Sequence, residues 1–146
     1  TEAKCDEDMR RLTTIPGVGA ITAATVKALV PDPEGFRSGR HFAAWLGLTP
    51  RPHSTGGKNL LGGISKMGNT ELRSLLVNGA TSVLRHARNS QKALPWLTAL
   101  LARRPFKVVA IALANKIARI IWALLAKGGT YRKPGAAAAA VGAAKV

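Results

Sequence analysis

The sequence predicts an all-α fold, a single helical domain, from three observations. Apolar residues recur at intervals of three and four in several segments, which is the spacing of an amphipathic helix. The chain has 146 residues and a hydrophobic fraction of 47%, enough for one core. No segment has the alternating pattern of a convincing strand, so a central sheet is not expected. The helical domain is predicted over residues 1–133, and the alanine-rich stretch 134–146 as a disordered tail.

A pair of helices joined by a tight turn is predicted over residues 12–30. Polar residues 6–13 favour a first helix, the turn is Ile15-Pro16-Gly17-Val18-Gly19, and an apolar helix follows. This arrangement resembles the helix-hairpin-helix motif. In that motif, amides of the hairpin and of the second helix's N-terminus hold a DNA phosphate without reading sequence. Gly17, Val18 and Gly19 are therefore predicted to contact DNA. The alternative is a plain helical hairpin that packs on the core.

A short helix is predicted next, because the Pro31-Asp32-Pro33 segment ends the preceding one. Ser38 suits its N-cap position. Phe42, Trp45 and Leu46 are expected to face inward. His41 lies among polar neighbours and is predicted to be a surface or capping residue rather than a ligand.

Residues 47–68 are predicted to form a long, irregular, ordered loop rich in glycine. Glycine lets the backbone approach a ligand closely, and hydroxyl and ammonium groups beside exposed amides suit a phosphate. We therefore predict that this loop meets a nucleic-acid backbone and attacks it. The residues expected to make these contacts are Ser54, Thr55, Gly56, Gly57, Lys58, Ser65 and Lys66. The alternative is an ordinary flexible turn.

Three further helices complete the predicted domain. The first is capped by Asn69 and carries Arg73 off its apolar face, where it could clamp a phosphate. The second covers residues 95–104, and the third runs over residues 106–127, between Pro105 and Gly128. The predicted core of the whole domain comprises Ile21, Leu29, Trp45, Leu46, Leu72, Leu75, Leu76, Leu113, Ile117 and Ile121.

Three polar residues, Asn115, Lys116 and Arg119, interrupt the apolar run of the last helix. The helix is therefore predicted to be a core helix rather than a membrane span. Two interpretations of these residues stay open. Lys116 and Arg119 could face nucleic acid, and Asn115 could satisfy a buried polar neighbour.

The charge of the chain points to a polyanionic partner. There are 22 Lys and Arg residues against 7 Asp and Glu, which gives a formal net charge of +15. The single cysteine, Cys5, excludes a disulfide framework within the chain and fits a reducing compartment. The acids form no recognisable metal triad, and the His and Cys residues lack zinc spacing, so no metal or other cofactor is predicted in this chain. No signal peptide is recognised, and the expected location is cytoplasmic.

Four motifs in order give a more specific reading: IPGVGAITAA, FRSGRHFAAWLGLTP, HSTGGKNLLGGISKMGN and ALANKIARIIWALLAKG. Together they resemble the carboxy-terminal transposase domain of the DEDD-type insertion-sequence transposases, the bridge-RNA-guided serine recombinases. The resemblance extends from Leu12 to Tyr131. It implies a bacterial, nucleoid-associated enzyme that forms homo-oligomers on a guide RNA with target and donor DNA.

The resemblance also implies which residues act. By motif match the nucleophile that forms a covalent link to DNA is Ser54, with Thr55 as the neighbouring alternative. The family's amino-terminal RuvC-like domain carries acidic ligands for Mg²⁺ and is absent here, and the chain opens without Met, as a fragment would. The fragment is therefore expected to be inactive alone, with His53 a weak choice of base and a carboxylate of the RuvC-like domain the more natural one.

Two functions of different classes follow from these observations. The first is the DNA-binding and catalytic-serine domain of a transposase or recombinase, acting in strand cleavage and rejoining. The second is a non-catalytic helix-hairpin-helix module of a repair or recombination protein. The glycine-rich loop separates the two, because a pure binding module has no use for a Ser-Thr-Gly-Gly-Lys loop of this length.

Overall fold

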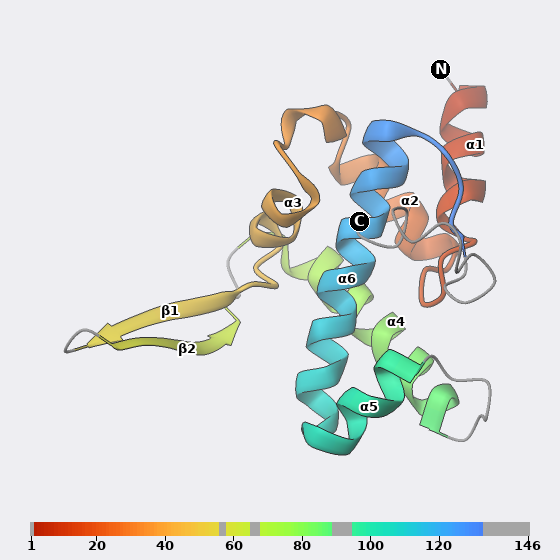
Figure 1. Cartoon of the computed structure of the whole chain (residues 1–146). Coiled ribbons are helices and arrows are strands. Elements are labelled where there is room, and N and C mark those ends of the chain that lie inside the picture. Colours follow the sequence, from red (N-terminus) through yellow and green to blue (C-terminus); the bar gives the residue numbers. More distant parts are fainter. Residues whose placement is uncertain (1, 56–57, 65–67, 89–94, 133–146) are drawn as a thin grey trace.

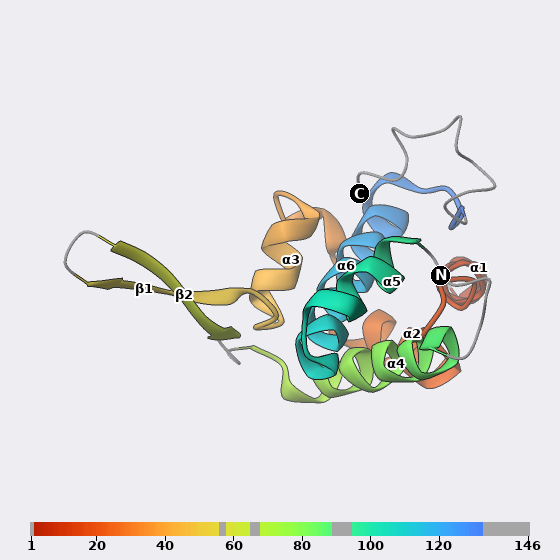
Figure 2. The ribbon, with the colours of Figure 1, turned by 60° about the horizontal axis from the view of Figure 1, so that its bottom comes forward.

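One long helix lies at the centre of the computed structural model, and shorter helices pack around it (Figures 1 and 2). The structure describes residues 2–55, 58–64, 68–88 and 95–132. The predicted 134–146 tail lies outside them. The elements in chain order are α1 (Glu2–Leu12), α2 (Ala20–Leu29), the 3₁₀ turn η1 (Pro33–Gly35), α3 (Gly39–Trp45), β1 (Pro50–Thr55), β2 (Lys58–Ile64), α4 (Thr70–Arg88), α5 (Pro95–Arg103) and α6 (Phe106–Lys127).

The central helix is α6, and α1, α3, α4 and α5 all contact it. It begins after Pro105 and ends at Gly128, whose φ of +79° is available to glycine at little cost. By length and composition α6 could cross a membrane, but half of its most apolar stretch is buried inside the domain. The predicted role of core helix is therefore confirmed, and with it the single helical domain.

The predicted core is confirmed in α4 and α6 and is partly wrong before them. Of the predicted residues, the following are buried: Leu46, Leu72, Leu76, Leu113, Ile117 and Ile121. Leu75 is half-buried. Three predictions were wrong, because Ile21, Leu29 and Trp45 are 73%, 37% and 38% exposed.

The error in α2 has a clear physical origin. Its buried face is formed by Thr22, Ala23 and Val26 rather than by its larger side chains. Small residues let this helix approach its neighbours closely, so Ile21 and Leu29 are left on the outside. The spacing correctly predicted a helix, but it placed the buried face on the wrong side.

A contact between two glycines fixes the α1–α2 turn against α4. Gly17 has a φ of +90°, and a Cβ on Gly79 of α4 would lie 2.0 Å from the carbonyl oxygen of Gly17. No side chain fits between two backbones at this distance. The turn and the fourth helix therefore depend on each other for their position.

Residues 50–64 correct the prediction of an irregular loop over 47–68. β1 and β2 form an antiparallel hairpin in which Ser54 pairs with Asn59 and Thr55 with Lys58. An extended segment of this length satisfies its backbone N–H and C=O groups by pairing with itself. The register is irregular between Pro50 and Pro52, where proline cannot donate to the ladder.

The hairpin projects away from the helices, and in both views no helix of the described chain covers it (Figures 1 and 2). The helical class is nevertheless confirmed, because the hairpin is an appendage of a helical body and not a central sheet.

Candidate nucleic-acid interface

The turn between α1 and α2 is the first predicted DNA contact, and the structure separates its three residues. Val18 is buried, and its N–H donates to the carbonyl of Ile15 at 3.0 Å. Gly17 faces Gly79. Only Gly19 lies at the surface, as the N-cap of α2, where no side chain caps the helix. The amides of the first turn of α2 therefore lack partners within their own helix, which is the arrangement that binds anions.

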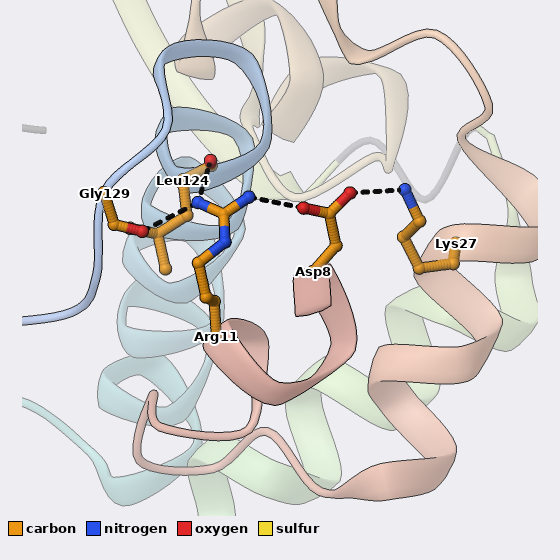
Figure 3. A network of polar contacts seen from close by, with 5 residues as sticks. All are labelled: Asp8, Arg11, Lys27, Leu124 and Gly129. Atoms are coloured by element: carbon orange, nitrogen blue, oxygen red, sulfur yellow. Dashed lines mark hydrogen bonds and ion pairs between the residues drawn. The ribbon is translucent and has the colours of Figure 1, made fainter. Parts of the chain in front are cut away.

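A network of charged groups holds this helix pair to the rest of the domain (Figure 3). The buried Asp8 carboxylate accepts hydrogen bonds from Arg11 and from Lys27 of α2, the latter at 2.8 Å. Arg11 also donates to the carbonyl oxygens of Leu124 at 3.0 Å, in the last turn of α6, and of Gly129 at 2.7 Å, just beyond that helix. Burial alone would raise the pKa of Asp8, but Lys27 and Arg11 outweigh it and hold this pKa below its ordinary value.

The hairpin carries the second group of predicted residues. Its register places Ser54, Thr55 and Lys58 together at the far end of the ladder. The other predicted residues of this stretch, Gly56, Gly57, Ser65 and Lys66, lie outside the described residues. In both ribbon views the hairpin and the α1–α2 pair occupy opposite sides of the molecule. The two predicted contacts are thus separate surfaces, with α6 between them.

Three side-chain and backbone contacts fix the base of the hairpin. Asn115 of α6 donates from Nδ2 to the Leu48 carbonyl at 3.2 Å, which confirms the interpretation that it satisfies a polar neighbour. Arg73 donates to the Leu46 carbonyl at 3.2 Å, so its guanidinium supports this region. On the returning side, Gly68 has a φ of +97° and lies against the backbone of Trp45.

Two predicted helix caps are confirmed on either side of the hairpin. Ser38 Oγ accepts from the N–H of His41 at 3.3 Å and lies 2.7 Å from its Nδ1, so the exposed His41 takes part in the cap of α3. Asn69 Oδ1 accepts from the N–H of Leu72 at 2.8 Å and caps α4. These caps set where the flanking helices begin.

Within the described ranges, no group of three or more His, Cys, Asp or Glu side chains could hold a metal ion.

The net charge of +15 on this helical domain is typical of proteins that bind nucleic acid. Comparison with known families makes the class definite. Residues 9–94 match the family described as "Transposase IS116/IS110/IS902 family". The chain belongs to this transposase family.

Individual relatives agree with that membership. The chain is 54% identical over 128 residues to a probable family 20 transposase of Pseudomonas aeruginosa, covering 87% of this chain and 38% of the relative. It is 50% identical over 131 residues to the transposase for insertion sequence element IS1111A of Coxiella burnetii, covering 89% and 36%. A pilin gene-inverting protein of Moraxella lacunata is 37% identical over 73 residues, covering 49% and 23%. The chain thus spans little more than a third of the length of the transposases it matches.

Proposed function

We propose that this chain is the DNA-binding and catalytic-serine domain of an insertion-sequence transposase. In this proposal it cleaves and rejoins DNA strands together with an amino-terminal RuvC-like domain. The observation that carries the proposal is the hairpin, because its register brings Ser54, Thr55 and Lys58 to the end that lies farthest from the helical body. A reactive hydroxyl on a projecting element can reach a DNA phosphate at a distance from the helices.

The proposed chemistry is transfer of a phosphodiester to Ser54. The hydroxyl gives its proton to a carboxylate of the RuvC-like domain and its oxygen attacks a backbone phosphorus. The bond from phosphorus to one sugar oxygen breaks, and that oxygen takes up a proton as the free strand end. The other strand end stays attached to Ser54 as a phosphate ester. Attack by a sugar hydroxyl from another strand reverses the step, releases the serine and rejoins DNA.

Charge stabilisation and proton removal are divided between two domains in this proposal. Lys58 and Lys66 offset the negative charge that builds up on the phosphate oxygens. The described residues of this chain offer no acidic set for a metal. Mg²⁺ is therefore assigned to the RuvC-like domain, where it would supply Lewis-acid activation.

Binding of DNA is proposed to involve the exposed turn at Gly19 and the net charge of +15. The resemblance described above supports three further parts of the proposal. These are a guide RNA, a homo-oligomeric assembly, and action in the bacterial cytoplasm at the nucleoid.

The nucleophile is tested by comparing Ser54→Ala with Thr55→Ala in the longer transposase that carries this domain. Labelled DNA is incubated with each protein, and covalent protein–DNA species are resolved on a denaturing gel. Ser54→Ala should abolish the covalent species and leave DNA affinity nearly unchanged, because one uncharged hydroxyl adds little to contacts dominated by Lys and Arg. Thr55→Ala should retain it.

The reverse pattern would place the nucleophile at Thr55. If neither substitution matters, the catalytic proposal fails and the hairpin is at most a phosphate contact. The non-catalytic binding module would then be the better account of this domain.

A further inference from the structure

Three cations from two helices lie next to one another where α3 packs on α6. A Cβ on Gly39 would lie 3.1 Å from the Cβ of Arg119, so the first turn of α3 touches α6 at that residue. Arg40 follows Gly39 directly, and Lys116 precedes Arg119 by one helical turn. We call Arg40, Lys116 and Arg119 the α3–α6 cation cluster.

No acidic side chain of the described chain forms a salt bridge with this cluster. Both salt bridges found there involve Asp8 of α1, a helix that lies across α6 from α3 (Figure 1). The sequence contains no acidic residue in α3, the hairpin, α5 or α6. The Nε of Arg119 is buried without a hydrogen-bond partner, which is a costly state for a guanidinium.

The pKa values of two cluster residues are lowered by burial and by neighbouring positive charge. Burial, and then the nearby charge of Arg119, lower the pKa of Lys116. Burial, and then the nearby charge of Arg40, lower the pKa of Arg119. Like charges held this close repel each other, and a bound anion would turn that repulsion into attraction.

We propose that the α3–α6 cation cluster binds the phosphate backbone of duplex DNA beside the base of the hairpin. The inference rests on the proposed function, which makes DNA the partner of this domain. The position follows from Asn115, which precedes Lys116 and bonds to Leu48 just before the hairpin begins. DNA held at the cluster would therefore lie next to the element that carries Ser54.

The aromatic side chains near the cluster favour a duplex over a single strand. Single-stranded nucleic acid is held largely by stacking of its bases on free aromatic faces. Here Lys116 Nζ lies 4.5 Å from the centroid of the Trp96 ring. Phe36 and Trp45 pack on each other, with ring centroids 5.4 Å apart. These contacts engage the rings, while Trp45 and Trp96 stay 38% and 40% exposed, and they hold the Lys116 ammonium in place for a backbone phosphate.

The test compares two triple variants of the full 146-residue chain. The first is Arg40→Gln with Lys116→Gln and Arg119→Gln. The matched control is Arg10→Gln with Lys127→Gln and Arg132→Gln, which removes the same number of charges at exposed positions elsewhere. Affinity for a fluorescein-labelled DNA duplex is measured by anisotropy over a series of KCl concentrations, and a same-sequence RNA duplex is the second probe.

The cluster variant should bind the DNA duplex about tenfold or more weakly near 0.1 M KCl, with a log–log salt slope shallower by about 2.7 for three lost phosphate contacts. The control should stay within about threefold of the wild type. A separate variant, Arg40→Lys with Arg119→Lys, should keep most of the wild-type salt slope, because both positive charges are kept. Circular dichroism checks folding. If the triple variant unfolds, the single variant Lys116→Gln takes its place, and its log–log salt slope should be shallower than that of the wild type by about 0.9.

Equal losses in the cluster variant and the control would overturn the inference. A loss seen with RNA and not with DNA would overturn the assignment to DNA. The covalent-species assay on Ser54 tests the function separately. If the covalent species forms but the cluster variant binds DNA as the wild type does, the proposed function stands and the proposed binding site fails. If the cluster variant binds more weakly but no covalent species forms, the binding site stands and the proposed catalytic function fails.

Discussion

The Asp8 carboxylate joins cations from two helices, so its replacement tests how the α1–α2 pair is held. Asp8→Asn removes the negative charge that Arg11 and Lys27 share and leaves both cations without their anionic partner. We expect a loss of roughly 2 kcal/mol in the free energy of unfolding at pH 7. Urea denaturation measures it. Asp6→Asn, on the exposed side of the same helix, should change stability little.

The same pair of variants makes a prediction about pH. The folded-state pKa of Asp8 lies below its ordinary value, which is about 3.9 in the unfolded chain. Its stabilising contribution is therefore complete above that pH and is lost as the pH falls through the folded-state pKa. The difference in unfolding free energy between wild type and Asp8→Asn should shrink on acidification from pH 5 downwards. A constant difference down to low pH would show that charge is not the cause.

Single residues were predictable where their role is local. Ser38 and Asn69 cap helices because of chemistry that acts over three residues, and sequence reveals that. The Arg73 bond to the Leu46 carbonyl joins residues 27 apart in the chain. Whether an arginine faces a ligand or its own backbone depends on such distant partners. The sequence therefore suggested a phosphate clamp and gave no sign of the structural contact.

At the scale of elements, the contact between Gly17 and Gly79 gives a prediction with an unusual sign. Gly→Ala inside a helix normally stabilises by about 1 kcal/mol. In α4, however, Gly79→Ala would place its Cβ 2.0 Å from the Gly17 carbonyl oxygen. We expect a net destabilisation of about 1–3 kcal/mol and a fall in Tm of about 3–10 °C. Thermal unfolding followed by circular dichroism measures this.

Gly19→Ala is the control for that experiment. A Cβ at Gly19 has nothing within 4 Å and the φ is −94°, so the only expected cost is that of alanine at the N-cap of α2, roughly 0.5–1 kcal/mol. If Gly79→Ala proves as harmless as the control, the two backbones are not in close contact. The same comparison shows that Gly17 is a poor site for testing DNA contact, since a bulky side chain there would disturb packing first.

The hairpin could have been recognised from the sequence by one signal. Ser-Thr-Gly-Gly-Lys contains two glycines between residues that can pair, a spacing typical of two-residue hairpin connections. The flanking strands are rich in proline, glycine and asparagine, which strands usually avoid. Composition therefore pointed to a loop, and backbone pairing decided the outcome.

At the scale of the whole molecule, the charge of +15 predicts how the chain binds DNA. Affinity for duplex DNA should be weak, nearly independent of sequence and steeply dependent on salt, with a slope of about −0.9 per phosphate contacted. Anisotropy titrations on two unrelated duplexes over a KCl series measure all three. Gly19→Leu should weaken binding with only a small fall in Tm, because open space surrounds that position and only the N-cap preference of α2 is lost. Affinity that does not change with salt would contradict this electrostatic account.

The overall arrangement of the candidate site was only partly foreseeable. Helical periodicity and caps predicted most helices, and charge predicted a polyanionic partner. Periodicity does not show which residues from distant helices meet. The closeness of Arg40 to Arg119 depends on how α3 crosses α6, which neither segment reveals alone. The opposite placement of the hairpin and the α1–α2 turn depends on the packing of every helix between them.

The length of the hairpin and its single point of attachment bear on how well its far end is positioned. A strand of seven residues reaches about 23 Å, and this one is attached to its domain at one end only. No helix of the described chain supports its far end, and a misplacement of about 1 Å can cost a reaction roughly a hundredfold in rate. Under the proposed function, a solitary copy would thus carry a nucleophile that it can hardly use. Cutting would begin only where a second surface clamps the tip, which is a safeguard for any genome that houses the enzyme.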